Sequence, residues 1–121
     1  MRFLIVDDSS TMRRIIINTL AKLGHQECVE AGNGREGLDR LATAAVDLVI
    51  TDWNMPEMSG IEFVRNLRAS EKTKNVPILM VTTNAAKDDI VEALRAGVNN
   101  YVVKPFTPDT IKEKIEAIIH R

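Results

Sequence analysis

The chain has 121 residues, of which 45% are hydrophobic and 27% charged, with a formal net charge of −1 and a single cysteine, Cys28. These values predict one globular domain over 1–121, exclude an internal disulfide and disfavour a nucleic-acid surface. No apolar run approaches the ~20 residues of a membrane span, so we expect a cytoplasmic protein without membrane attachment.

Five short apolar runs alternate with five amphipathic stretches along the chain. The runs predict buried strands over 3–6, 27–31, 46–51, 77–81 and 101–103. The amphipathic stretches predict helices over 12–23, 36–44, 61–67, 87–96 and from 108 onward. Candidate N-caps are Ser9, Ser10 or Thr11, Ser59 and Thr107, and candidate helix ends are Gly24 and Gly97. This alternation predicts a doubly wound parallel sheet of five strands with helices on both faces.

Polar side chains follow four of the five predicted strands, at the point where each strand ends. Asp7 and Asp8 follow the first, Asp52 the third, Thr82 the fourth and Lys104 the fifth. In doubly wound sheets, ligands bind outside the carboxyl ends of the strands, where the strand order reverses. We therefore expect these five side chains to form one site, to which the strand over 27–31 adds no comparable residue.

The charges of this predicted site call for a cation. Three carboxylates and one ammonium sum to −2, and two like charges about 4 Å apart repel by around 4 kcal/mol at a surface-like dielectric. The ligands are hard oxygens without histidine or cysteine, which favours Mg²⁺, with Mn²⁺ as the other candidate. Mg²⁺, a lysine and a hydroxyl together suit phosphoryl transfer. Asp52, alone at the end of the middle strand, is the candidate nucleophile.

The same residues resemble the receiver domain of response regulators. The resemblance is carried by Val6-Asp7-Asp8, Asp52-Trp53-Asn54-Met55-Pro56, Thr82 and Tyr101-Val102-Val103-Lys104-Pro105-Phe106. The runs Ser10-Thr11-Met12-Arg13-Arg14 and Asp52 to Pro56 are similar to chemotaxis members more than to receivers in general. The resemblance spans essentially the whole chain. It implies a flavodoxin-like (βα)5 fold with strand order 2-1-3-4-5, and a cis peptide bond between Lys104 and Pro105.

The resemblance also implies a role for each of these residues. Asp52 would accept a phosphoryl group from a histidine kinase. Mg²⁺ would be held by Asp7, Asp8, Asp52 and the backbone carbonyl of Asn54. Thr82 and Lys104 would bind the phosphoryl oxygens, and Thr82 with Tyr101 would form the switch. The partner surface would comprise Lys87, Ile90, Tyr101 and Lys114.

As a chemotaxis receiver, the chain would act as a monomeric signalling protein rather than as an enzyme. Its partners would be the histidine kinase, the flagellar motor switch protein and a phosphatase. An alternative within the family is a stand-alone receiver that serves as a phosphorelay intermediate or phosphate sink. Thr83 and Asn84 depart from close relatives beside the switch residue, and a β-branched Thr83 is expected to narrow access to the phosphate.

Two other classes share part of this pattern. A Mg²⁺-dependent aspartyl phosphatase resembles Asp-x-Asp on the first strand with a cap domain, whereas this chain has adjacent aspartates and a length that leaves no room for a cap. A flavodoxin-like FMN binder needs a Ser/Thr/Gly-rich phosphate loop after the first strand. Asp7 and Asp8 place negative charge at that position instead.

Overall fold

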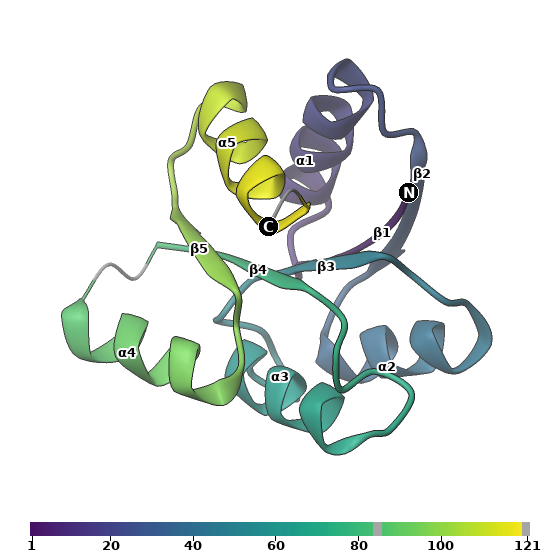
Figure 1. Ribbon diagram of the computed structural model, residues 1–121, viewed down its shortest axis with the longest axis vertical. Helices are drawn as coiled ribbons and strands as arrows, with labels where there is room; N and C mark the ends of the chain where they lie inside the picture. The colour runs from purple at the N-terminus through teal and green to yellow at the C-terminus, as the bar shows by residue number, and fades with distance from the viewer. Residues whose placement is uncertain (84–85, 120–121) are drawn as a thin grey trace.

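The computed structural model describes residues 1–83 and 86–119 of the chain. Within these ranges the elements are β1 Arg2–Val6, α1 Ser10–Lys22, β2 Glu27–Ala31, α2 Gly34–Thr43, β3 Leu48–Thr51, α3 Gly60–Ala69, β4 Ile78–Thr82, α4 Lys87–Ala96, β5 Asn100–Val103 and α5 Pro108–Ile119. The strands form one parallel sheet in the order β2-β1-β3-β4-β5 (Figure 1). The predicted doubly wound, flavodoxin-like fold is thereby confirmed.

Two layers of helices cover the sheet, with α1 and α5 on one face and α2, α3 and α4 on the other (Figure 1). Successive side chains of a strand point to opposite faces. In β1, Leu4 and Val6 belong to the core under the three-helix layer, whereas Phe3 and Ile5 belong to the core under α1 and α5. A strand buried on both faces needs apolar residues at every position, which explains the uninterrupted apolar runs.

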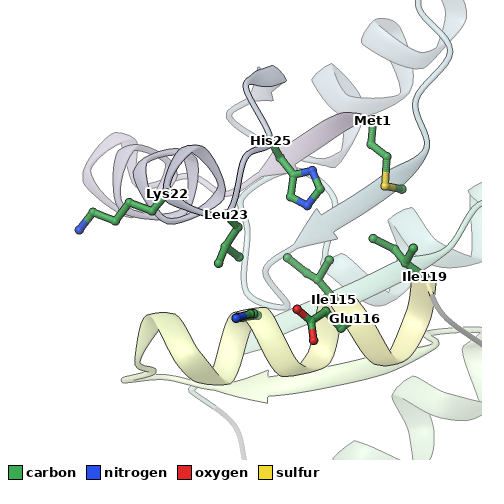
Figure 2. A pocket seen from close by; sticks show the side chains of 8 residues that line it. Met1, Lys22, Leu23, His25, Ile115, Glu116 and Ile119 are labelled. Carbon is green, nitrogen blue, oxygen red and sulfur yellow. The ribbon is translucent and has the colours of Figure 1, made fainter.

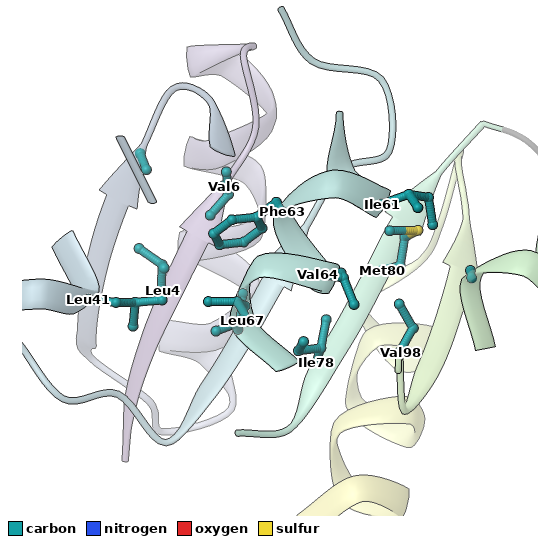
Figure 3. Packing of buried hydrophobic residues seen from close by; sticks show 13 residues of the cluster. Leu4, Val6, Leu41, Ile61, Phe63, Val64, Leu67, Ile78, Met80 and Val98 are labelled. Atoms are coloured by element: carbon teal, nitrogen blue, oxygen red, sulfur yellow. The ribbon is translucent and has the colours of Figure 1, made fainter. Parts of the chain in front are cut away.

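The core under the three-helix layer is centred on α3. Figure 3 shows Phe63 lying against Val6 of β1, while Val64 and Leu67 lie near Ile78 of β4. These five side chains are fully or almost fully buried. Burying a side chain of this size contributes about 1.5–3 kcal/mol. The packing fixes the directions of β1 and β4 and therefore the positions of the residues that follow them.

Capping explains where three helices begin. The Ser9 hydroxyl accepts a hydrogen bond from the N–H of Met12, and the Ser59 hydroxyl accepts one from the N–H of Glu62. Thr107 accepts from the N–H of Thr110 at the start of α5. These three predicted caps are confirmed, and they fix where α1, α3 and α5 begin after the connections from β1, β3 and β5.

Several predicted boundaries were wrong by one or two residues, and the starts of α2 and β3 show the reasons. Helix α2 begins at Gly34 rather than at residue 36, because the side chain of Asn33 caps it by accepting from the N–H of Glu36. Strand β3 begins at Leu48 rather than at residue 46, because its pairing with β1 starts at Phe3 and Leu48. Among the described residues, no helix is long and apolar enough to cross a membrane.

Candidate functional site

Strand register brings Asp7, Asp52 and Lys104 together at the end of the sheet where its strands terminate, the carboxyl end. Val6 pairs with Thr51, so the residues that follow them, Asp7 and Asp52, leave neighbouring strands at the same level. The N–H of Asp52 donates to the carbonyl of Val6 at 2.9 Å, which continues the ladder by one residue. The order β2-β1-β3 reverses direction here, so the site lies at the topological switch point.

Lys104 lies between the two buried aspartates. Its Nζ is 3.1 Å from Oδ2 of Asp7 and 3.3 Å from Oδ2 of Asp52. The three side chains are only 13%, 2% and 11% exposed, respectively. The ammonium offsets part of the repulsion between the two carboxylates, whose desolvation would otherwise be strongly unfavourable. The predicted peptide bond between Lys104 and Pro105 is cis, as the resemblance implied.

Asp8 completes an acidic cluster with Asp7 and Asp52. One carboxylate oxygen from each residue lies within 4.8 Å of the others, and Asp8 is exposed whereas its two partners are buried. With Lys104 included, the cluster carries a formal charge of −2. An exclusively oxygen donor set of this charge, open to solvent on one side, fits a hard divalent ion that keeps part of its water shell. The predicted metal-binding residues Asp7, Asp8 and Asp52 are thus close enough to share one ion.

Asp52 has two features that distinguish it from an ordinary surface carboxylate. Burial raises the pKa of Asp52; Lys104 opposes the rise, and Asp7 adds to it. Its Oδ1 accepts a hydrogen bond from the N–H of Trp53 at 2.7 Å, while Oδ2 faces Lys104. The carboxylate is therefore held in one orientation, and bringing a cation to it would favour its charged form.

Gly60 allows α3 to begin directly against the backbone of the acidic strand end. A side chain at Gly60 would collide with the main-chain carbonyl of Asp52. The N–H of Gly60 donates to the carbonyl of Trp53 at 2.7 Å. The loop between β3 and α3 thus folds back on itself. Asn54 lies in this loop, two residues after Asp52, and is exposed.

Thr82 and Tyr101 lie on neighbouring strands and on the same face of the sheet. Tyr101 pairs with Met80, and Thr82 is two residues further along β4, so both side chains point toward the three-helix layer. Thr82 is buried, while Tyr101 is half-buried. The ammonium of Lys114 on α5 lies 5.7 Å from the centre of the Tyr101 ring.

The remaining predicted residues lie away from the acidic cluster. Lys87 is exposed and Ile90 half-buried on α4, and half-buried Lys114 is on α5. These two helices flank β5 at the edge of the sheet (Figure 1). Asn54 and Thr83 are exposed. Asn84 lies outside the described residues.

A cavity of about 410 Å³ lies at the other end of the sheet. Figure 2 shows Lys22 and Leu23 at the end of α1, Met1 before β1 and Ile119 at the end of α5 around it. Met1 precedes β1, Lys22 ends α1 and is followed by Leu23, and Ile119 ends α5. These positions lie at the end of the sheet where its strands begin. The cavity is therefore separate from the acidic cluster, and it contains none of the predicted site residues.

The sequence reasoning missed the contribution of Arg13 to the surroundings of the cluster. Its Nη1 donates to the main-chain carbonyl of Asp7 at 2.6 Å, and its Nε donates to Glu30 at 2.9 Å. The sequence identified Arg13 only as part of the run from Ser10 to Arg14 that resembles chemotaxis members. Its position in the first turn after a functional strand end was the available signal.

The fold and the cluster define a flavodoxin-like α/β protein with an acidic site at the carboxyl edge of its sheet. The family model of the response regulator receiver domain matches residues 3–116 of the sequence. Chemotaxis protein CheY1 of Helicobacter pylori is 52% identical over 120 residues, covering 98% of this chain and 97% of that protein.

Two solved structures extend the comparison. The chemotaxis response regulator CheY4 of Vibrio cholerae has a TM-score of 0.90 and 37% identity, and the match covers 97% of each chain. The receiver domain of the sensor histidine kinase PA1611 of Pseudomonas aeruginosa has a TM-score of 0.89 and 27% identity, covering 99% of this chain and 98% of that one. That structure carries a magnesium ion coordinated in its active-site cleft.

The chain belongs to the response-regulator receiver family. Its relatives further define it as a CheY-like receiver of bacterial chemotaxis, within a family of signalling proteins.

Proposed function

We propose that the protein transmits a chemotaxis signal by accepting a phosphoryl group on Asp52 from a histidine kinase, in the presence of Mg²⁺. The observation that carries this proposal is the buried arrangement of Asp52, Asp7 and Lys104 at the switch point, with Asp8 open to solvent beside them. The magnesium-containing receiver of PA1611 supports the choice of metal.

Asp7, Asp8, Asp52 and the carbonyl of Asn54 would hold the metal. When bound, Mg²⁺ supplies positive charge that offsets the repulsion between the carboxylates and an incoming phosphoryl group. An oxygen of Asp52 would attack phosphorus as the bond from phosphorus to the donor nitrogen breaks, and the electron pair of that bond would stay on the imidazole nitrogen of the kinase histidine. Lys104 neutralises a phosphoryl oxygen, and the hydroxyl of Thr82 donates a hydrogen bond to another.

The switch follows from the shared face of Thr82 and Tyr101. When Thr82 turns toward the phosphoryl group, it vacates space on the side of β4 that Tyr101 also faces. Tyr101 then moves inward and changes the surface formed by α4, β5 and α5, on which Lys87, Ile90, Tyr101 and Lys114 bind partners. Phosphorylation thereby shifts the population between two states of this surface. The favoured partner of the phosphorylated state is the flagellar motor switch protein.

The first test is phosphorylation by a small acyl phosphate or phosphoramidate in the presence of Mg²⁺. We expect wild type to take up acid-labile phosphate, and Asp52→Asn to take up none, because the amide is not a nucleophile of this kind. Asp39→Asn is a matched control, because Asp39 is an exposed aspartate on α2. Uptake by Asp52→Asn at the wild-type rate would exclude Asp52 as the acceptor.

The second test addresses the output. We expect the phosphorylated protein to bind the N-terminal peptide of the flagellar switch protein more tightly than the unphosphorylated protein does. A Lys114→Gln variant, which still carries Asp52, should be phosphorylated normally but bind the peptide more weakly. Equal affinity of the phosphorylated and unphosphorylated wild-type protein would instead support a role as relay intermediate or phosphate sink.

A further inference from the structure

The guanidinium of Arg13, in the first turn of α1, holds the loop between β1 and α1. Arg13 donates from Nη1 to the main-chain carbonyl of Asp7 at 2.6 Å. After Asp8, the N–H of Ser9 donates a hydrogen bond to the side-chain Oδ1 of Asp7 at 2.9 Å. The chain is thus fixed on both sides of Asp8 by bonds that involve Asp7.

The Asp7 carbonyl belongs to the peptide unit that joins Asp7 to Asp8. A peptide unit is planar, so fixing its oxygen fixes the orientation of the N–H and Cα of the next residue. Asp8 is exposed and has none of the burial that immobilises Asp7 and Asp52. Its placement therefore depends on the backbone that carries it, and Arg13 holds that backbone.

Glu30 of β2 restrains the guanidinium and offsets its charge. Nε of Arg13 lies 2.9 Å from Oε1 of Glu30, and the Arg13 side chain is only 19% exposed. An unpaired guanidinium beside the acidic cluster would repel a divalent cation. Strand β2, which ends without a functional side chain of its own, thus contributes to the site through Glu30.

We propose that Arg13, held by Glu30, is a positioning residue that orders Asp8 for the binding of Mg²⁺. The inference depends on the proposed metal site but not on the identity of the phosphodonor or of the output partner. Residues that orient metal ligands typically change metal affinity by about 10–100-fold when they are removed. The expected effect of Arg13 is at the lower end of this range, because it orders one of three carboxylates.

Calorimetric titration of the purified protein with Mg²⁺ alone tests this role. Charge and positioning make opposite predictions for Arg13→Ala: loss of a nearby positive charge would tighten Mg²⁺ binding, whereas loss of the restraint on Asp8 would weaken it. We expect Arg13→Ala to raise the dissociation constant about tenfold. Arg14→Ala removes an exposed arginine from the adjacent position of the same helix, and its dissociation constant should stay within about twofold of wild type.

Two further variants keep the test decisive. Arg13→Lys keeps the positive charge but lacks the planar guanidinium that contacts the Asp7 carbonyl and Glu30 together, and it should weaken Mg²⁺ binding about threefold to fivefold even if Arg13→Ala does not fold. Asp8→Asn tests the metal site itself, because unchanged Mg²⁺ binding by this variant would refute the site irrespective of Arg13. A dissociation constant of Arg13→Ala equal to or below that of Arg14→Ala would overturn the positioning role, as would unchanged binding by Arg13→Lys.

Discussion

Lys104 and Arg68 are two cationic side chains at opposite ends of the sheet, and their partners differ in charge. Lys104 follows β5 and contacts the carboxylates of Asp7 and Asp52. Arg68 reaches from α3 to the segments that precede β4 and β5. Its guanidinium donates to the carbonyls of Thr73, Lys74, Val76 and Gly97 and to the side-chain oxygen of Asn99.

The partners indicate what each cation does. The acceptors of Arg68 are neutral, so its five N–H groups join the ends of several segments without creating excess charge. Lys104 leaves its cluster at −2, and burial raises the pKa of Asp52 despite the ammonium beside it. The Arg68 end is organised for stability. The Lys104 end retains unfavourable electrostatics that a divalent ion and a phosphoryl group would relieve, as expected of a functional site.

The largest effect on stability is expected from Arg68→Ala. Its short bonds to Val76 (2.6 Å) and Gly97 (2.7 Å) would be lost together, leaving carbonyls of two connecting segments without their donor. We expect a loss of about 4 kcal/mol in the free energy of unfolding, measured by urea denaturation. Arg65→Ala, at an exposed position of the same helix, should change it by less than about 0.5 kcal/mol.

Mg²⁺ affinity is a second property by which the Arg68 end of the sheet should differ from the Lys104 end. The affinity of folded Arg68→Ala should match wild type within about twofold, because Arg68 lies at the opposite end of the sheet. A tenfold loss of Mg²⁺ affinity in this variant would contradict the assignment of Arg68 to stability and of Lys104 to the metal-binding cluster.

Lys104→Met should have a smaller effect that depends on the metal. Without divalent ions, we expect a loss of about 2–3 kcal/mol, because two buried carboxylates lose their shared partner. Mg²⁺ should raise the melting temperature of this variant more than that of wild type, because the cluster is then more negative. Lys112→Met, an exposed lysine on α5, provides the control. A smaller Mg²⁺-dependent shift in Lys104→Met than in wild type would show that Lys104 organises the metal ligands rather than competing with the ion.

The smallest effect, and one of opposite sign, is expected from Asp52→Asn in the presence of a chelator. Burial raises the pKa of Asp52 in the folded protein, so ionisation of this group opposes folding. The amide should stabilise the protein by about 1 kcal/mol at neutral pH. The gain should vanish below the usual aspartate pKa of about 3.9 and be complete above the raised value. Thermal denaturation of both proteins across this pH range measures it, and a gain that grows as pH falls would refute the assignment.

Much of the fold was predictable because the decisive signals are local. Strands buried on both faces require uninterrupted apolar runs. Ser9 and Ser59 are residue types that commonly cap helix N-termini, and they indicate where α1 and α3 begin. The boundary at Gly34 was missed because Gly32-Asn33-Gly34 is indistinguishable from a loop until Asn33 is seen to cap a helix. The convergence of Asp7, Asp52 and Lys104 was predictable because parallel strands share one carboxyl edge.

Contacts set by the angles between elements were not predictable in this way. The bond from Arg13 to the Asp7 carbonyl depends on how α1 leaves β1, and its pairing with Glu30 depends on the register of β2. Arg68 contacts Gly97, which is 29 residues away, and no local pattern identifies that acceptor. Both arginines appear in the sequence as ordinary polar residues of amphipathic helices, because periodicity reports which face is buried but not which carbonyl a side chain reaches.

Mapping the phosphorylated residue tests the central claim most directly. The protein is phosphorylated with a small phosphodonor and Mg²⁺ and then treated with borohydride, which reduces an acyl phosphate of aspartate to homoserine. Peptide mass spectrometry should find this conversion at Asp52, and at neither Asp7 nor Asp8. Conversion at Asp7 or Asp8, or a phosphorylated protein with an unmodified Asp52 peptide, would contradict the assignment of Asp52 as the phosphoryl acceptor.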